Sequence, residues 1–177
     1  MRLRVATLCT LASLALTASA DGTKFGLGLR GGVFMPSSAP VKNALGKSWT
    51  SIGIGPSWIG YTVGKHSMWD VDMWGVSSNG NRAFVIMPTY GYQIVKGDPK
   101  KKDEVKPFAA AHVGPIYADY RLGTNSGRKF GMGGALEVGG VYSDRLRVSA
   151  RYNMVSKVGG LDFSGLNLTF SWTVTKF

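Results

Sequence analysis

FSGLNLTFSWTVTKF, residues 163–177, alternates strictly between apolar and polar side chains. One parity carries the bulky apolar residues Leu166, Leu168, Phe170, Trp172 and Val174. The other parity carries the small polar residues Asn167, Thr169, Ser171, Thr173 and Thr175. Successive side chains of a β-strand point to opposite faces, so this stretch predicts a strand with one apolar and one polar face.

Seven further alternating segments precede this strand and are separated by turn-forming residues. Their predicted ranges are 24–35, 48–64, 67–76, 82–95, 105–122, 128–142 and 146–155. None shows a sustained apolar stripe with a period of 3.6 residues, so we expect little helix. A long loop at 36–47 and a turn at Asn79-Gly80 are among the connections. The sequence therefore predicts an all-β fold, an eight-stranded antiparallel up-and-down barrel.

Three prolines, Pro56, Pro88 and Pro115, lie inside the predicted strands. Proline removes a backbone donor from the ladder, and a closed barrel has no edge strand to accommodate it. We therefore expect a bulge at each proline. In the 48–64 segment the apolar residues also change parity near Pro56, as a bulge would cause.

The composition of the non-bulky face of these strands distinguishes a membrane barrel from a soluble barrel. A transmembrane barrel turns its bulky apolar residues to lipid and its small or polar residues to the lumen. In the first, sixth, seventh and eighth segments this face is rich in glycine, alanine, serine, threonine and charged residues. Aromatic residues near strand ends and on the apolar faces suit interfacial girdles: Trp49, Trp58, Tyr61, Trp69, Tyr90, Tyr92, Tyr117, Tyr142, Tyr152 and Trp172. The alternative is a secreted soluble barrel that binds a small apolar ligand.

The N-terminal stretch MRLRVATLCTLASLALTASA has the features of a secretory signal peptide. Arg2 and Arg4 precede an apolar core that is too short to span a bilayer as a helix, and Ala18-Ser19-Ala20 forms an A-x-A cleavage site. We expect cleavage after residue 20, leaving residues 21–177 as a single barrel domain. Cleavage removes Cys9, the single cysteine, and two arginines, so the net charge of +11 falls by two.

The basic balance predicts contact with anionic lipid headgroups rather than nucleic acid, because export separates the chain from nucleic acid. The densest charged run, at 98–104, is typical of a solvated turn rather than a binding patch.

The signal peptide, the eight alternating segments, the glycine-rich stretch GMGGALE at 131–137 and the terminal Phe177 together resemble the small OmpA/OmpX-type outer-membrane barrels. The resemblance implies a non-enzymatic barrel in the outer membrane of a Gram-negative-type envelope, supporting envelope integrity or surface interaction through its loops. It also implies contact with lipopolysaccharide-type headgroups, recognition of the C-terminal strand by the barrel assembly machinery, and a monomer. One departure is that Phe177 shares its parity with polar Thr175, whereas the family's terminal aromatic shares the apolar face.

Some eight-stranded outer-membrane barrels modify lipid A with a histidine, a serine and an acid. His66-Ser67, and His112 with Glu137, supply these residue types, which are the ingredients of nucleophilic catalysis. Their spacing matches no catalytic pattern, so we predict no catalytic, cofactor-binding or metal site. A lipid-A-modifying enzyme remains the less favoured alternative.

Eight strands enclose only enough space for side chains, so we expect a closed lumen. Charges that face such a lumen must pair, and the inward parities supply six: Arg30, Asp70, Asp72, Glu137, Arg147 and Arg151. A three-residue loop at 143–145 would set Glu137 directly opposite Arg151, which predicts an ion pair between them. With a periplasmic N-terminus, strand counting places 36–47, 77–81, 123–127 and 157–162 outside the cell.

Overall fold

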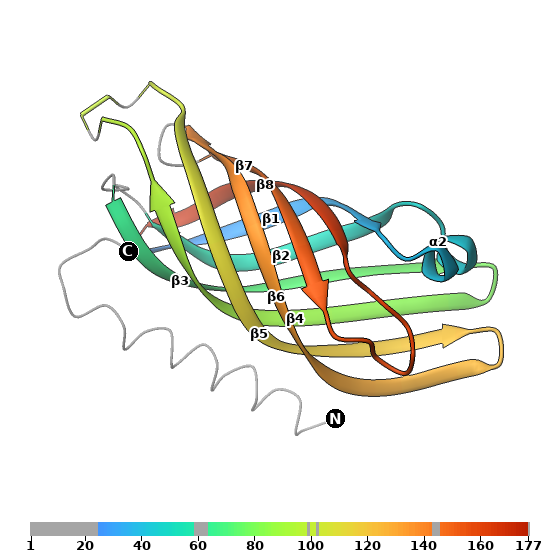
Figure 1. Ribbon diagram of the computed structural model, residues 1–177. Coiled ribbons are helices and arrows are strands. Elements are labelled where there is room, and N and C mark those ends of the chain that lie inside the picture. Colours follow the sequence, from blue (N-terminus) through green and yellow to red (C-terminus); the bar gives the residue numbers. More distant parts are fainter. Residues whose placement is uncertain (1–24, 59–63, 99, 102, 143–145, 177) are drawn as a thin grey trace.

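A computed structural model shows a closed barrel of eight antiparallel strands (Figure 1). It describes residues 25–58, 64–98, 100–101, 103–142 and 146–176; the predicted signal peptide lies outside these ranges. The strands are β1 (Phe25–Pro36), β2 (Trp49–Trp58), β3 (Gly64–Ser78), β4 (Asn81–Val95), β5 (Lys106–Leu122), β6 (Asn125–Tyr142), β7 (Leu146–Val155) and β8 (Gly165–Lys176). Each strand pairs with its sequence neighbours and β8 pairs with β1, which confirms the predicted fold class.

The strands differ in length, and this gives the two ends of the barrel different shapes. β3 to β6 have 15 to 18 residues, whereas β1, β2, β7 and β8 have 10 to 12. The β3–β4 and β5–β6 hairpins therefore extend beyond the other strands at one end, while the β4–β5 connection lies at the other (Figure 1). The predicted Asn79-Gly80 turn closes β3–β4, and both residues have positive φ, 50° and 78°.

The loop predicted at 36–47 contains a short helix, α2 (Ala39–Leu45), which lies at the end where the hairpins protrude (Figure 1). Val41 and Leu45 of α2 are fully buried. Within the described residues, no helix is long and apolar enough to cross a membrane.

Pro56, Pro88 and Pro115 lie in strands without the bulge predicted at each. The β1–β2, β3–β4 and β5–β6 registers pass through them unshifted. Pairing between β4 and β5 is interrupted at 87–89 and 114–116 with the same register on both sides, so Pro88 lies opposite Pro115. The two missing donors thus share one gap in the ladder, and a single interruption accommodates both prolines.

A register shift does occur where β8 closes the barrel against β1. It lies between Leu27 and Gly28, and Val174 is the extra residue in β8. A one-residue insertion reverses the side-chain alternation beyond it. Phe177, the terminal aromatic whose parity departs from the family's pattern, lies outside the described residues.

The bulky apolar residues of the strands lie on the outside of the barrel. Each of the following strand residues is at least 40% exposed: Leu29, Val33, Ile52, Phe84, Tyr90, Tyr92, Ile94, Val113, Phe130, Met132, Leu136, Val138, Tyr142, Val148, Tyr152, Met154, Leu168, Phe170 and Trp172. They form an apolar outer wall with residues from every strand except β3, as a bilayer-spanning barrel requires.

The lumen is layered along the barrel axis, and β4 shows the sequence of layers. Its inward residues are apolar toward the α2 end (Ala83, Val85 and Met87), polar in the middle (Thr89 and Gln93), and apolar again at Val95. The expectation of a small or polar interior throughout is therefore wrong at the α2 end. Side chains of one parity share a face, but the alternation alone does not predict where along the strand that face is apolar and where it is polar.

Five aromatic side chains fill the α2 end of the lumen and are called the aromatic plug: Phe34, Trp49, Trp74, Tyr120 and Phe163. Phe34 stacks on Trp74 with ring centroids 5.0 Å apart, and it lies 5.4 Å from Trp49. Trp49, expected in an outer girdle, is instead buried in this plug. Its position in β2 gives it the inward parity of Ser51, so it contributes to a core rather than to an interface.

Candidate functional site

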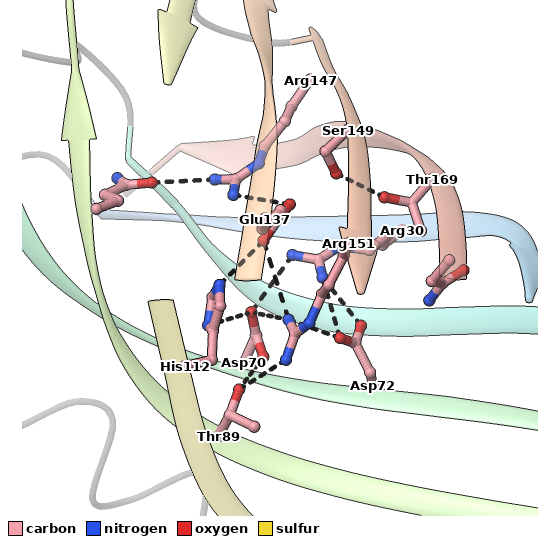
Figure 2. A network of polar contacts seen from close by, with 12 residues as sticks. Arg30, Asp70, Asp72, Thr89, His112, Glu137, Arg147, Ser149, Arg151 and Thr169 are labelled. Atoms are coloured by element: carbon pink, nitrogen blue, oxygen red, sulfur yellow. Dashed lines mark hydrogen bonds and ion pairs between the residues drawn. The ribbon is translucent and has the colours of Figure 1, made fainter. Parts of the chain in front are cut away.

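Next to the aromatic plug along the barrel axis, the middle of the lumen holds a charged layer (Figure 2). All six charged residues predicted to face the lumen lie in this layer. Its members are Arg30 from β1, Asp70 and Asp72 from β3, His112 from β5, Glu137 from β6, and Arg147 and Arg151 from β7. Each of these residues is buried, with at most 9% of its surface exposed. The alternation of five strands therefore delivers all these groups to one level of the lumen.

Two aspartates and two arginines form the densest part of this layer (Figure 2). Arg151 Nη1 lies 2.7 Å from Asp72 Oδ2 and 2.9 Å from Asp70 Oδ2. Arg30 Nη1 lies 3.0 Å from Asp72 Oδ1, and Arg30 Nη2 is 3.5 Å from Asp70 Oδ2. The hydroxyl of Thr89 donates a hydrogen bond to the carboxylate of Asp70. Each aspartate thus contacts both guanidinium groups, which compensates part of its desolvation cost.

Glu137 occupies the other side of the layer and contacts three different groups. Its carboxylate lies 2.9 Å from Arg147 Nη2, 3.0 Å from His112 Nε2, and 4.0 Å from Arg151 Nη1. The predicted register is confirmed, since Glu137 pairs directly with Arg151 in the β6–β7 ladder. The arginine nearest to Glu137 is nevertheless Arg147, which lies four residues closer to the turn in β7.

Arg147 links the charged layer to the lower end of the lumen. Its guanidinium carbon lies 3.8 Å from the ring centroid of Phe108, and its Nη1 donates to Gln93 Oε1 at 3.1 Å. Phe108 forms a second apolar cluster with Val95 and Val141. Apolar side chains therefore cover the charged layer on both sides.

Asp70, His112 and Glu137 each offer one ligand atom of a kind that binds metal ions. One ligand atom from each lies within 4.8 Å of the others. Sequence reasoning missed this grouping, because their separations of 42 and 25 residues become proximity only through the strand register. However, Arg151 and Arg147 already contact the two carboxylates at 2.9 Å. A metal cation would have to displace these fixed positive charges, so the donor set favours arginine pairing.

The possible catalytic groups do not form a nucleophilic site that a lipid could reach. The His112 side chain is fully buried, and its Nε2 contacts Glu137 at 3.0 Å. The hydroxyl of Thr89, in the same layer, bonds Asp70. His66-Ser67 lies within β3, opposite Gln93 and Tyr92.

The connections at the α2 end are tied to one another above the aromatic plug. Asn81, which begins β4, donates its side-chain amide to the α2 carbonyl of Ala44 at 3.1 Å. It also accepts from the backbone N–H of Gly123 in the β5–β6 turn at 2.8 Å. Ser37 donates its backbone N–H to the carbonyl of Ser164, before β8, at 2.8 Å. These bonds link connections far apart in sequence into one cover over the mouth.

Comparisons with known proteins place this architecture among small eight-stranded outer-membrane barrels. The outer membrane enzyme PagL is 18% identical, with a TM-score of 0.52, over 83% of this chain and 99% of the other. The attachment invasion locus protein Ail of Yersinia pestis is 10% identical, with a TM-score of 0.52, over 88% and 99%. Neisserial surface protein A is 14% identical, with a TM-score of 0.51, over 87% and 98%. No protein-family model and no curated protein matches the sequence. At these identities the similarity establishes the fold.

Proposed function

We propose that this chain, a barrel with the outer-membrane architecture, resides in the outer membrane of a Gram-negative-type envelope and acts without catalysis. It would contribute to envelope integrity or to surface contacts through the connections at its α2 end. The observation that carries the proposal is the inverted distribution of residues, with an apolar outer wall and a buried charged layer. A soluble barrel with this exterior would expose far more contiguous apolar surface than soluble proteins tolerate.

The filled lumen supports a structural or adhesive role over transport. The aromatic plug, the charged layer and the lower cluster around Phe108 occupy successive levels of the barrel. The same filling disfavours the alternative of a secreted barrel with an apolar ligand inside. We expect no steady ion conductance when the purified protein is inserted into planar bilayers.

A lipid-A-modifying activity is the less favoured candidate. PagL shares the fold and is an enzyme, so the fold alone is compatible with catalysis. The buried position of His112 and Glu137 supports the non-enzymatic proposal, because a lipid would have to pass the plug to reach them. Mass spectrometry of lipid A from cells with and without the protein tests this point, and a change in acylation would contradict the proposal.

The proposal includes three expectations about partners. The apolar wall would contact outer-membrane lipid, the C-terminal strand would be recognised by the barrel assembly machinery, and the protein would be a monomer. Membrane location is tested by fractionation. We expect extraction only with detergent and a gel band that shifts on heating. Recovery of folded protein in the soluble periplasmic fraction would contradict it.

A further inference from the structure

The outer wall changes from apolar to charged on three adjacent strands near the α2 end. On β4 this change runs from Phe84 to Arg82, on β5 from Tyr117 to Asp119, and on β6 from Phe130 to Arg128. The register aligns the steps on β5 and β6, because Tyr117 pairs with Phe130 and Asp119 with Arg128. On β4 the step lies two residues nearer the hairpin tip, because Phe84 pairs with Asp119. This boundary is where a bilayer's acyl chains would give way to headgroups.

Two hollows meet at this boundary. One, of about 720 Å³, is largely apolar and includes Ile52, Met73 and Phe84 in its walls. Gly75 forms part of its wall without a side chain. The other hollow, of about 420 Å³, lies farther toward the hairpin tip and includes Arg121 and Ser126.

The two hollows share Arg82, Asp119 and Arg128. Arg128 donates its Nε hydrogen bond to Asp119 Oδ2 at 3.0 Å, and Arg82 Nη2 lies 3.7 Å from Asp119 Oδ1. The half-buried Asp119 thus fixes two arginines that are otherwise more than half exposed. A guanidinium has five N–H donors, so each arginine keeps donors for a further acceptor.

We propose that these joined hollows bind a lipopolysaccharide-type lipid, with a phosphate on Arg82 and Arg128 and an acyl chain in the apolar hollow. The charges support this occupant, because Arg82, Arg121 and Arg128 exceed Asp119 by two positive charges. The geometry supports a lipid over a free anion, because the two arginines that would hold the phosphate also line the largely apolar hollow, which suits an acyl chain. Arginine forks match phosphate oxygens in bidentate geometry. The inference rests on the proposed function, since it requires the α2 end to face lipid of this class.

Native mass spectrometry of the folded barrel in neutral detergent tests the site. The probes are diphosphoryl lipid A, the same lipid without its phosphates, and inorganic phosphate alone. We expect the barrel to retain one lipid A, and the variant Arg82→Gln with Arg128→Gln to retain at least about tenfold less, because it loses charge-assisted hydrogen bonds from both arginines. The matched control is Lys96→Gln with Lys100→Gln, which removes the same charge at the opposite end and should retain lipid A as the unaltered chain does.

Asp119→Asn separates a positioned site from simple charge attraction. It makes the local charge more positive, which alone would strengthen the binding of lipid A. It also removes the carboxylate charge that orients both arginines, so we expect the retention of lipid A to fall. Stronger retention by Asp119→Asn would overturn the site as built here. Equal retention by both double variants, equal retention of the dephosphorylated lipid, or equal retention of inorganic phosphate would also overturn it.

Failure of this inference can be distinguished from failure of the proposed function. The same preparations are tested for detergent-dependent extraction and heat-modifiable migration. A heat-modifiable membrane barrel without preference for phosphorylated lipid contradicts the inference alone. A protein that is soluble without detergent contradicts both.

Discussion

Glu137 and Arg151 are direct cross-strand partners inside the barrel, yet each makes its shortest ion pairs with other residues. Glu137 lies 2.9 Å from Arg147, and Arg151 lies 2.7 Å from Asp72. The two groups themselves are 4.0 Å apart. The charged layer is therefore a network spanning several strands, rather than a set of isolated pairs between neighbours. Removing one member should affect charges on more than one strand.

Double-mutant cycles, with the free energy of unfolding as the readout, should show which members of this charged network are energetically coupled. We expect a larger coupling energy between Glu137→Gln and Arg147→Gln than between Glu137→Gln and Arg151→Gln, because the first pair is in direct contact. Both couplings should exceed the range of about 0–1 kcal/mol typical of exposed pairs. Urea unfolding in detergent micelles or lipid vesicles measures them. Zero coupling in both cycles would contradict a buried network.

Replacing Arg151 by glutamine should be among the most damaging changes in the lumen. The change leaves Asp70 and Asp72 with Arg30 as their remaining close arginine. Breaking a buried ion pair on one side typically costs about 3–5 kcal/mol. The exposed Lys157→Gln is the control and should leave the urea midpoint nearly unchanged. Similar midpoints for the two variants would contradict this expectation.

Leu136→Arg tests whether the outer wall contacts lipid. Leu136 is 58% exposed and adjoins Glu137, so it lies on the outside at the level of the charged layer. Arginine at the bilayer midplane costs about 2–4 kcal/mol on a transmembrane barrel. We expect a loss of this size for unfolding from lipid vesicles. A soluble barrel would tolerate the same change, so an unchanged stability would count against membrane insertion.

Phe34→Ala tests the aromatic plug. Phe34 is fully buried between Trp49 and Trp74, and truncating such a phenylalanine typically costs about 3–5 kcal/mol. Phe130, which is 79% exposed on the outer wall, provides the matched control. In detergent, Phe130→Ala should shift the unfolding midpoint much less than Phe34→Ala. Equal shifts would contradict a packed plug.

Limited trypsin digestion of intact cells tests the orientation. The α2 end carries the exposed Lys47 and Lys157, and the opposite end carries Lys96, Lys100 and Lys101. With the α2 end outside, cleavage should occur after Lys47 or Lys157, and the other three sites should be cut only after the outer membrane is permeabilised. Cleavage at Lys100 in intact cells, without cleavage at the α2 end, would reverse the orientation.

The period-two alternation was sufficient to predict which residues share a face. It gave the bounds of β7 as 146–155, which the structure reproduces, and it placed Arg30, Asp70 and Glu137 on inward parities. Once the turn at 143–145 was assigned three residues, the Glu137–Arg151 register followed. These features depend on local alternation and turn length, which a single strand or hairpin contains.

Features that depend on several strands at once were not predicted. The aromatic plug forms because Phe34, Trp49 and Trp74 reach the same level of the lumen from three strands. The Pro88–Pro115 gap likewise depends on the β4–β5 register. α2 was missed because seven residues with a proline near the start give too short a pattern for a helical period. Its burial against the plug stabilises it instead.

The pairing of β8 with β1 has a consequence for how the barrel forms. The two strands that close the sheet are separated by most of the chain, since Met35 pairs with Leu166. Until β8 has docked, both β1 and the last completed strand expose unpaired backbone groups. Contacts of such long sequence separation form slowly, because the chain must lose loop entropy before they stabilise it. Circularly permuting the chain to join β8 to β1 and to open another turn should therefore transfer this slow closing contact to the new terminal strands, while leaving the finished barrel unchanged.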